Sequence, residues 1–188
     1  MVKKERLTTK QKLKAAVIKG SLLRVRWLCL TKSVSQNALD AALIEAIKNG
    51  RLNIVTFLHK KGANVKFKGP TGTTLVMFAA VFGFLEIVKY LHKNGGDIHA
   101  VNDRGKTALI TAAAANRLDV VKYLHQNGAN IHLRDNEGND ALLWAAKREF
   151  PELFKYLMAH NADPNVYNKE HMTAGLYCSG WKMWKDLK

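Results

Sequence analysis

Along the chain, two segments whose apolar residues have helical spacing are followed by one polar stretch. Residues 107–115 are rich in strong helix formers, and their alanines allow a neighbouring helix to approach closely. Residues 118–126 place apolar side chains three apart, which is typical of an amphipathic helix. Gly128 follows where a left-handed helix cap is expected, and the polar stretch 130–138 contains one apolar anchor, Ile131. The pattern therefore predicts a helix, a tight turn, a second helix and an extended finger.

This unit recurs with a period of 33 residues. Three series of short segments share the spacing: 62–65, 95–98, 128–131 and 161–164; 52–55, 85–88 and 118–121; and 72–74, 105–107 and 138–140. A fixed period of this length is typical of a solenoid, in which each unit completes the hydrophobic interior of its neighbours. The sequence therefore predicts one stacked array.

The repeated unit resembles the ankyrin repeat. The matching residues are Gly105, Thr107, Leu109, Ala112, Ala113, Leu118, Asp119, Val120, Val121, Lys122, Leu124, Gly128, Ala129, Asn130 and Ile131. The resemblance implies an all-α ankyrin-repeat solenoid of about six stacked helix-turn-helix units. Four regular units are expected at about 36–68, 69–101, 102–134 and 135–167.

The two ends of the array are expected to be degenerate capping units, because a terminal unit must present one face to water. We interpret 1–35 as a basic N-terminal segment with a capping repeat, and 168–188 as a partial C-terminal capping repeat. Inside the array, Glu149 replaces the glycine that usually separates the two helices, and Pro151 follows it. We expect a locally different turn there, with Pro151 opening the second helix.

The composition is that of an ordinary folded protein, with 47% hydrophobic and 24% charged residues among 188. No uninterrupted apolar stretch is long enough for a spanning helix, and two cysteines are too few for a disulfide framework. We therefore expect an intracellular, cytoplasmic protein. The Asn- and Lys-rich repeats, with segments such as 93–95, also resemble those of ankyrin proteins from intracellular bacteria and large DNA viruses, which often act on host proteins. For such a source the resemblance implies the host cytosol or nucleus.

Positive charge is concentrated at the N-terminus. The chain carries a net charge of +15, and residues 1–35 contain ten Lys and Arg against one acid. The basic run consists of Lys3, Lys4, Arg6, Lys10, Lys12 and Lys14. It could contact an acidic protein, an anionic membrane surface or RNA, serve nuclear import, or simply form a solvated cap.

Little in the sequence points to catalysis. His59, His92 and His125 recur at the repeat period, so we expect them to serve the repeat, and His160 and His171 have no partner at metal-ligand spacing. No phosphate-binding glycine loop or metalloprotease motif is found in the sequence. We therefore expect no enzyme activity, no cofactor, no metal site and no small-molecule substrate.

The resemblance implies a partner protein bound on the concave face made by finger tips and inner helices. By register, the finger candidates are Lys68, Asp103, Arg104, Lys106, Asn136, Glu137 and Asn139, and the helix candidates are Lys48, Asn49, Val81, Phe82, Phe84, Ala114, Ala115, Lys147 and Arg148. The apolar group at 81–84 is flanked by cations, which suits a peptide with an apolar anchor and acidic neighbours.

Two alternatives stay open at this stage. Phe82 and Phe84 could simply pack on adjacent fingers. The chain could also be an electrostatic adaptor whose basic N-terminus docks on an anionic membrane or a nucleic acid. A protein-protein interaction module is the function that the sequence predicts.

Overall fold

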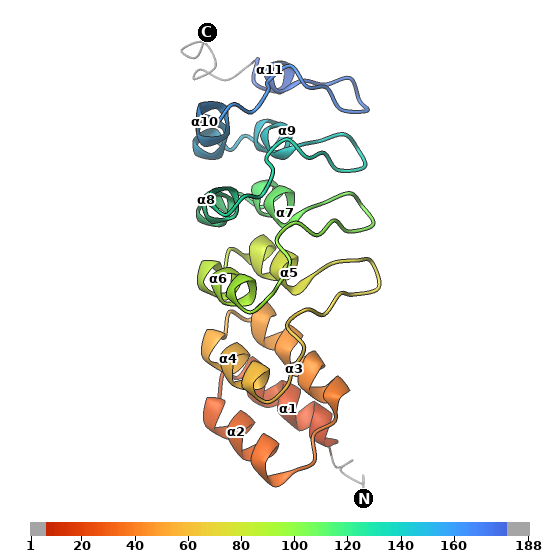
Figure 1. The fold of residues 1–188 in the computed structure, drawn as a ribbon, viewed down its shortest axis with the longest axis vertical. Helices are drawn as coiled ribbons and strands as arrows, with labels where there is room; N and C mark the ends of the chain where they lie inside the picture. Colours follow the sequence, from red (N-terminus) through yellow and green to blue (C-terminus); the bar gives the residue numbers. More distant parts are fainter. Residues whose placement is uncertain (1–6, 180–188) are drawn as a thin grey trace, which may run out of the picture.

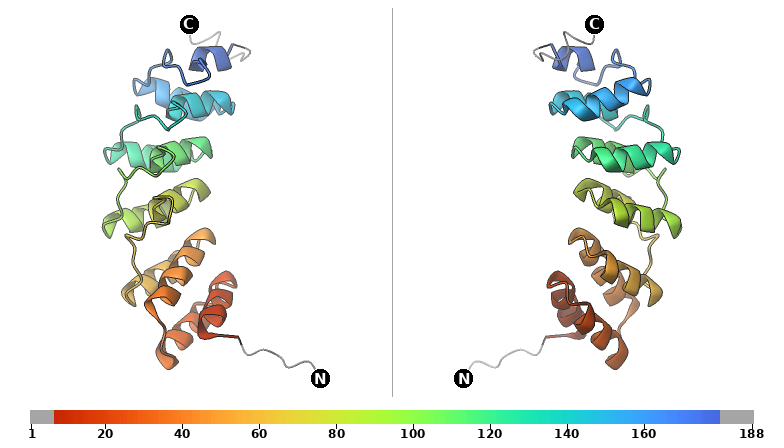
Figure 2. Two further views of the ribbon diagram at one scale, coloured as in Figure 1. Left: turned by 90° about the vertical axis from the view of Figure 1, so that its right-hand side faces the viewer. Right: turned by 90° about the vertical axis from the view of Figure 1, so that its left-hand side faces the viewer.

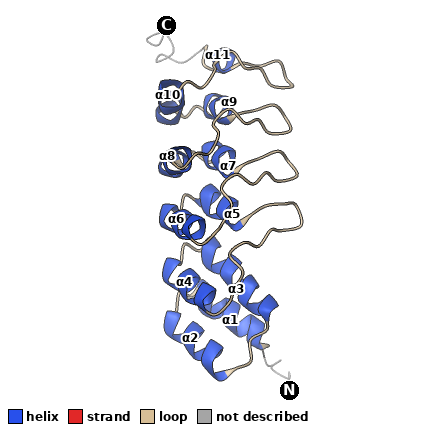
Figure 3. Ribbon diagram, viewed as in Figure 1, coloured by secondary structure: helices blue, strands red, loops and turns tan. Residues whose placement is uncertain are grey.

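The computed structural model describes residues 7–179, and within this range every regular element is a helix (Figure 3). The helices are α1 (Thr9–Ile18), α2 (Leu22–Thr31), α3 (Gln36–Lys48), α4 (Leu52–Lys60), α5 (Leu75–Phe82), α6 (Leu85–Lys93), α7 (Ala108–Ala114), α8 (Leu118–Gln126), α9 (Ala141–Lys147), α10 (Pro151–Ala159) and α11 (Ala174–Tyr177). The predicted all-α solenoid is confirmed.

The helices form hairpins that stack into an elongated array of two columns (Figures 1 and 2). The odd-numbered helices make the inner column, and the even-numbered helices α2 to α10 make the outer column. Inner helices contact the next inner helix along the chain, and outer helices do the same from α2 to α8. The fingers that link successive hairpins project on the side of the inner column (Figure 1).

One continuous hydrophobic core runs through the array. Alanine pairs on the inner helices, such as Ala112 with Ala113 and Ala145 with Ala146, are buried. Their small side chains let successive helices approach closely, as the sequence pattern predicts. The outer helices add larger buried residues, among them Leu124, so each hairpin fills the interior shared with its neighbours.

Side-chain caps fix the start of the inner helices. Thr74, Thr107, Asp140 and Thr173 are each the N-cap residue of an inner helix, and each side-chain oxygen accepts a hydrogen bond from the backbone N–H three residues later. These bonds satisfy backbone donors that an uncapped helix would leave unpaired. The position recurs every 33 residues, so each finger ends in the same way.

The turn at Glu149 corrects one expectation. Glu149 has φ 58°, close to the values of 77° for Gly83 and 55° for Asn116 at the same place in earlier hairpins. The N–H of Phe150 donates to the Ala145 carbonyl at 2.9 Å, as the equivalent residues do one hairpin earlier. The turn thus keeps the common geometry, and the prediction of a different turn was wrong.

The chain beyond that turn follows the sequence-based expectation. Pro151 is the first residue of α10, where its fixed φ suits the helix start. None of the helices within residues 7–179 is both long and apolar enough to cross a membrane.

Candidate partner-binding surface

The fingers are tied to one another along the array. The N–H of Asp103 donates to the Thr71 carbonyl at 3.1 Å, and the N–H of Asn136 donates to the Arg104 carbonyl at 2.9 Å. The next pair of fingers repeats the contact at the N–H of Lys169. Because each finger is hydrogen-bonded to the next, the surface they form with the inner helices is ordered before any partner arrives.

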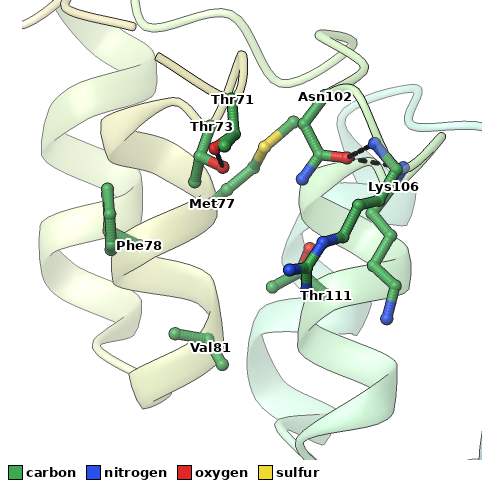
Figure 4. A pocket seen from close by; sticks show the side chains of 9 residues that line it. Thr71, Thr73, Met77, Phe78, Val81, Asn102, Lys106 and Thr111 are labelled. Carbon is green, nitrogen blue, oxygen red and sulfur yellow. Dashed lines mark hydrogen bonds between the residues drawn. The ribbon is translucent and has the colours of Figure 1, made fainter. Parts of the chain in front are cut away.

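A hollow of about 310 Å³ opens on this surface between α5 and α7 (Figure 4). Met77, Phe78 and Val81 of α5 form one wall, and Thr111 of α7 faces them. The finger residues that complete the lining are Thr71, Thr73, Asn102, Arg104 and Lys106. The hollow therefore combines an apolar wall with a polar and cationic rim.

The cationic rim continues onto an indole ring of the next unit. The Lys106 Nζ lies 4.1 Å from the centre of the Trp144 ring, and the Arg148 guanidinium lies 5.3 Å from it. The Trp144 Nε1 donates to Asp135 Oδ2 at 2.8 Å, which fixes the ring. Both cations gain from the face of the indole. Burial lowers the pKa of Lys106, and the nearby carboxylate of Asp135, 3.9 Å away, opposes that shift.

A second ion pair lies one unit further along. The Lys147 Nζ is 3.1 Å from Glu170 Oε2, and the Tyr177 hydroxyl donates to the same oxygen at 3.1 Å. The hydrogen bond that Lys147 donates to Glu170 raises the pKa of Lys147 and lowers the pKa of Glu170. Because Lys147 already has an anionic partner, it is less available to a bound protein than Arg148.

The structure separates the predicted apolar patch into two places. Val81 lines the hollow together with Arg104 and Lys106. Phe82 instead stacks on Phe84, with ring centres 5.8 Å apart, at the turn between α5 and α6. The Phe84 ring lies against Gly50 of the preceding turn, less than 3 Å from where a Cβ would stand. Phe84 thus packs on the preceding turn, and Phe82 stacks on Phe84.

Several other candidates serve the array itself. Asn139 is only 3% exposed, and its side-chain oxygen accepts a hydrogen bond from Asn168 at 2.8 Å, so it joins two fingers and does not face solvent. Asn136 donates to the Asp103 carbonyl at 2.8 Å. Asn49 donates to the carbonyl of Glu45 at the end of α3.

The remaining candidates are distributed over the fingers and helix ends. Lys48 lies 5.7 Å from the centre of the Phe78 ring, so it stands beside the hollow. The fingers expose Lys68, Asp103 and Glu137, and the end of α7 carries the half-buried Ala114 with Ala115 following it.

Register missed one variable position on this surface. The fourth residue of α5, α7, α9 and α11 is Phe78, Thr111, Trp144 and Tyr177 in turn, spaced 33 apart. Each side chain is half-buried or exposed, and three of the four lie beneath a Lys or Arg. The signal was available, because this position changes in every unit while its two neighbours in the sequence stay apolar.

The structure describes only part of the basic run, because residues 1–6 lie outside the described range. Lys3, Lys4 and Arg6 fall in that segment. Lys14 forms an ion pair with Glu45 at 3.4 Å, while Lys10 and Lys12 are exposed.

The periodic histidines join the units of the outer column. The Nδ1 atoms of His59, His92 and His125 lie 2.8, 2.9 and 3.0 Å from a tyrosine hydroxyl of the following unit. The tyrosines are Tyr90, Tyr123 and Tyr156. These residues therefore serve the repeat. Within residues 7–179 no group of three or more potential metal ligands is found.

Both cysteines are free thiols. Cys178 is the buried C-cap residue of α11, and burial raises its pKa to about 11, with a smaller contribution from Glu149. Cys29 is half-buried on α2, and burial raises its pKa as well. A raised pKa keeps each thiol protonated and weakly nucleophilic.

Stacked hairpins, capped inner helices and hydrogen-bonded fingers define a helical-repeat protein with an ordered surface of fingers and inner helices. Residues 76–168 match the family model of ankyrin repeats in three copies. The chain therefore contains ankyrin repeats and folds as an ankyrin-repeat helical solenoid. No curated protein matches the chain. Ankyrin repeats are in general protein-protein interaction modules, and the family is typically non-enzymatic.

Proposed function

We propose that the concave surface binds a segment of a partner protein, with one apolar side chain in the hollow between α5 and α7. Acidic neighbours of that side chain would lie against Arg104, Lys106 and Arg148. The single observation that supports this assignment most is the hollow itself, because it joins an apolar wall to a rim of cations. Such a combination favours an apolar anchor with acidic flanks.

The electrostatics of the rim favour an anion over a neutral group. Burial lowers the pKa of Lys106, and its Nζ lies 3.9 Å from Asp135 Oδ2, which is longer than a hydrogen bond, so Lys106 is less tightly paired than Lys147. A partner carboxylate would give it a charge-assisted hydrogen bond, which is stronger than a neutral one. The net charge of +15 would also raise the rate of encounter with an acidic partner.

The rigidity of the surface supports binding without a large ordering cost. Backbone hydrogen bonds join successive fingers, and the Trp144 ring is held by its bond to Asp135. A surface that is ordered in the free protein loses little conformational entropy on binding.

Selection from a random peptide library displayed on phage tests the proposal directly. Enriched peptides are expected to share one apolar residue with Asp or Glu nearby. Their affinity, measured by fluorescence anisotropy, is expected to fall at least about tenfold in Thr111→Glu, which places a charge in the hollow. Gln126→Glu on the outer side of the same unit is the matched control, since it adds the same charge at an exposed site.

A second variant tests the acidic preference. Arg104→Gln should reduce the selection for Asp and Glu and leave the apolar residue enriched. The proposal is contradicted if no sequence is enriched, or if the enriched peptides bind Thr111→Glu and Gln126→Glu equally well.

A further inference from the structure

Helix α2 presents a stripe of large apolar side chains to solvent. Leu23 is 81% exposed, Trp27 is 56% exposed and Leu30 is 67% exposed. They stand four and three residues apart, so they share one face of the helix. Val25 and Leu28 on the same helix are buried and supply its contact with the core.

The stacking of the repeats does not explain the two leucines. Leu23 is the second residue of α2, and the second residues of the other outer helices are Asn53, Glu86, Asp119 and Glu152, all exposed. Leu30 is the ninth residue, where the other outer helices have Lys60, Lys93, Gln126 and Ala159, again all exposed. Units packed in the same way thus carry mostly polar residues here. The leucines stand at positions that point away from the array.

Cations without acids surround this stripe. Residues 7–35 contain seven Lys and Arg and no Asp or Glu. Arg24 and Arg26 lie on α2 itself, and Arg24 lines a shallow hollow with Lys12, Lys19 and the exposed Leu7. The stripe is therefore a convex apolar face within a positive field.

The apolar stripe and the cations around it together favour one kind of binding partner. A second copy would bring an equal positive charge against the first, which opposes association. A nucleic acid would pair with the cations and leave the leucines in water. An interfacial helix on an anionic membrane places Leu and Trp among the headgroups and Lys and Arg against the lipid charges, so it uses both features.

We propose that the α2 face, formed by Leu23, Trp27 and Leu30 with Arg24 and Arg26, docks the protein on an anionic membrane surface. The face lies at the N-terminal end of the outer column, away from the fingers (Figures 1 and 2). The concave surface stays accessible while α2 is docked. This inference goes beyond the proposed function, and neither depends on the other.

Vesicle co-sedimentation with the full chain tests the proposal. Wild type should sediment with phosphatidylcholine vesicles that contain phosphatidylserine and not with phosphatidylcholine vesicles alone. The double variant Leu23→Asn/Leu30→Lys gives α2 the residues found in α4 and raises the net charge by one. Its affinity for the anionic vesicles should fall about tenfold or more, because the apolar contact is lost.

Two further variants separate the apolar contact from charge. Arg24→Gln should weaken binding to anionic vesicles, and the loss should be larger at low salt. Gln126→Lys adds the same single charge as the double variant on a distant outer helix and should bind as wild type does. All replaced side chains are exposed, so urea midpoints should confirm that each variant is folded.

Three results would overturn the proposal. The first is an absence of binding to anionic vesicles, as expected if the face serves an acidic protein instead. The second is equal or stronger binding by Leu23→Asn/Leu30→Lys, which would indicate a purely electrostatic contact. The third is a wild-type dimer in analytical ultracentrifugation that this double variant dissociates.

Discussion

Glu149 occupies a backbone conformation that favours glycine, so Glu149→Gly should stabilise the array. Its φ of 58° lies in the left-handed region, and the equivalent residues Gly50 and Gly83 have φ of 66° and 77°. The hydrogen bond from the Phe150 N–H to the Ala145 carbonyl holds the turn in this shape. The side chain of Glu149 is exposed, so its removal costs little packing.

The size of the effect follows from two opposing terms. A residue with a Cβ in the left-handed region costs roughly 1–2 kcal/mol relative to the right-handed one. Glycine loses about 0.5–1 kcal/mol more conformational entropy on folding than other residues do. The difference predicts a gain of about 0.5–1 kcal/mol in the free energy of unfolding, which corresponds to a rise of about 0.3 M in the urea midpoint.

Urea unfolding followed by far-UV circular dichroism measures this gain. Glu149→Gln is the matched control, because it removes the charge and keeps the Cβ. We expect Glu149→Gln to unfold at nearly the midpoint of wild type and Glu149→Gly to unfold above both. The reasoning fails if glycine gives no higher midpoint than glutamine, since the backbone would then carry no strain at this turn.

Three further perturbations test the caps, the outer column and the thiols. Burial raises the pKa of Asp140 above its unfolded value of 3.8, so the folded protein takes up a proton more readily than the unfolded chain does. Wild type should therefore gain stability relative to Asp140→Thr as the pH falls from neutral to about 4. Urea midpoints measured across that pH range test this. Tyr123→Phe removes one histidine–tyrosine hydrogen bond and should cost about 1 kcal/mol, whereas Tyr167→Phe, whose side chain is exposed, should cost little. Cys178, with its pKa near 11, should react with iodoacetamide more slowly than Cys29 in the folded protein, and equal rates followed by mass spectrometry would contradict its burial.

The stacking of the hairpins could be predicted because one local pattern recurs in register. Alanines on the inner helices, Val and Leu on the outer helices and a capping residue before each inner helix all repeat every 33 residues. The shape of the turn at Glu149 does not follow from its residue type. The surrounding hydrogen bonds and the helices on both sides fix that turn, so it keeps its shape at a small cost in backbone strain.

The candidate surface was less predictable than the fold. Of the residues that register places on this surface, Val81, Arg104 and Lys106 line one hollow. Register also groups Phe82 with Val81, although consecutive residues of a helix point about 100° apart, and the structure turns Phe82 toward Phe84. Asn139 shows the same limit, since its register places it on a finger but its hydrogen bond to Asn168 buries it.

Stacking of the repeats restricts the residue type at one outer-helix position more strongly than at one inner-helix position. In the outer column, the sixth residue of each helix from α6 to α10 is a tyrosine that contacts a histidine of the preceding unit, so a change at either residue affects two units. In the inner column, the fourth residue is Phe78, Thr111 or Trp144, and the hairpins on either side keep the same geometry. A position that can change without altering the stack is free to contribute to recognition. The same reasoning applies to α2, where Leu23 and Leu30 depart from the polar pattern of the outer column at positions that stacking leaves free.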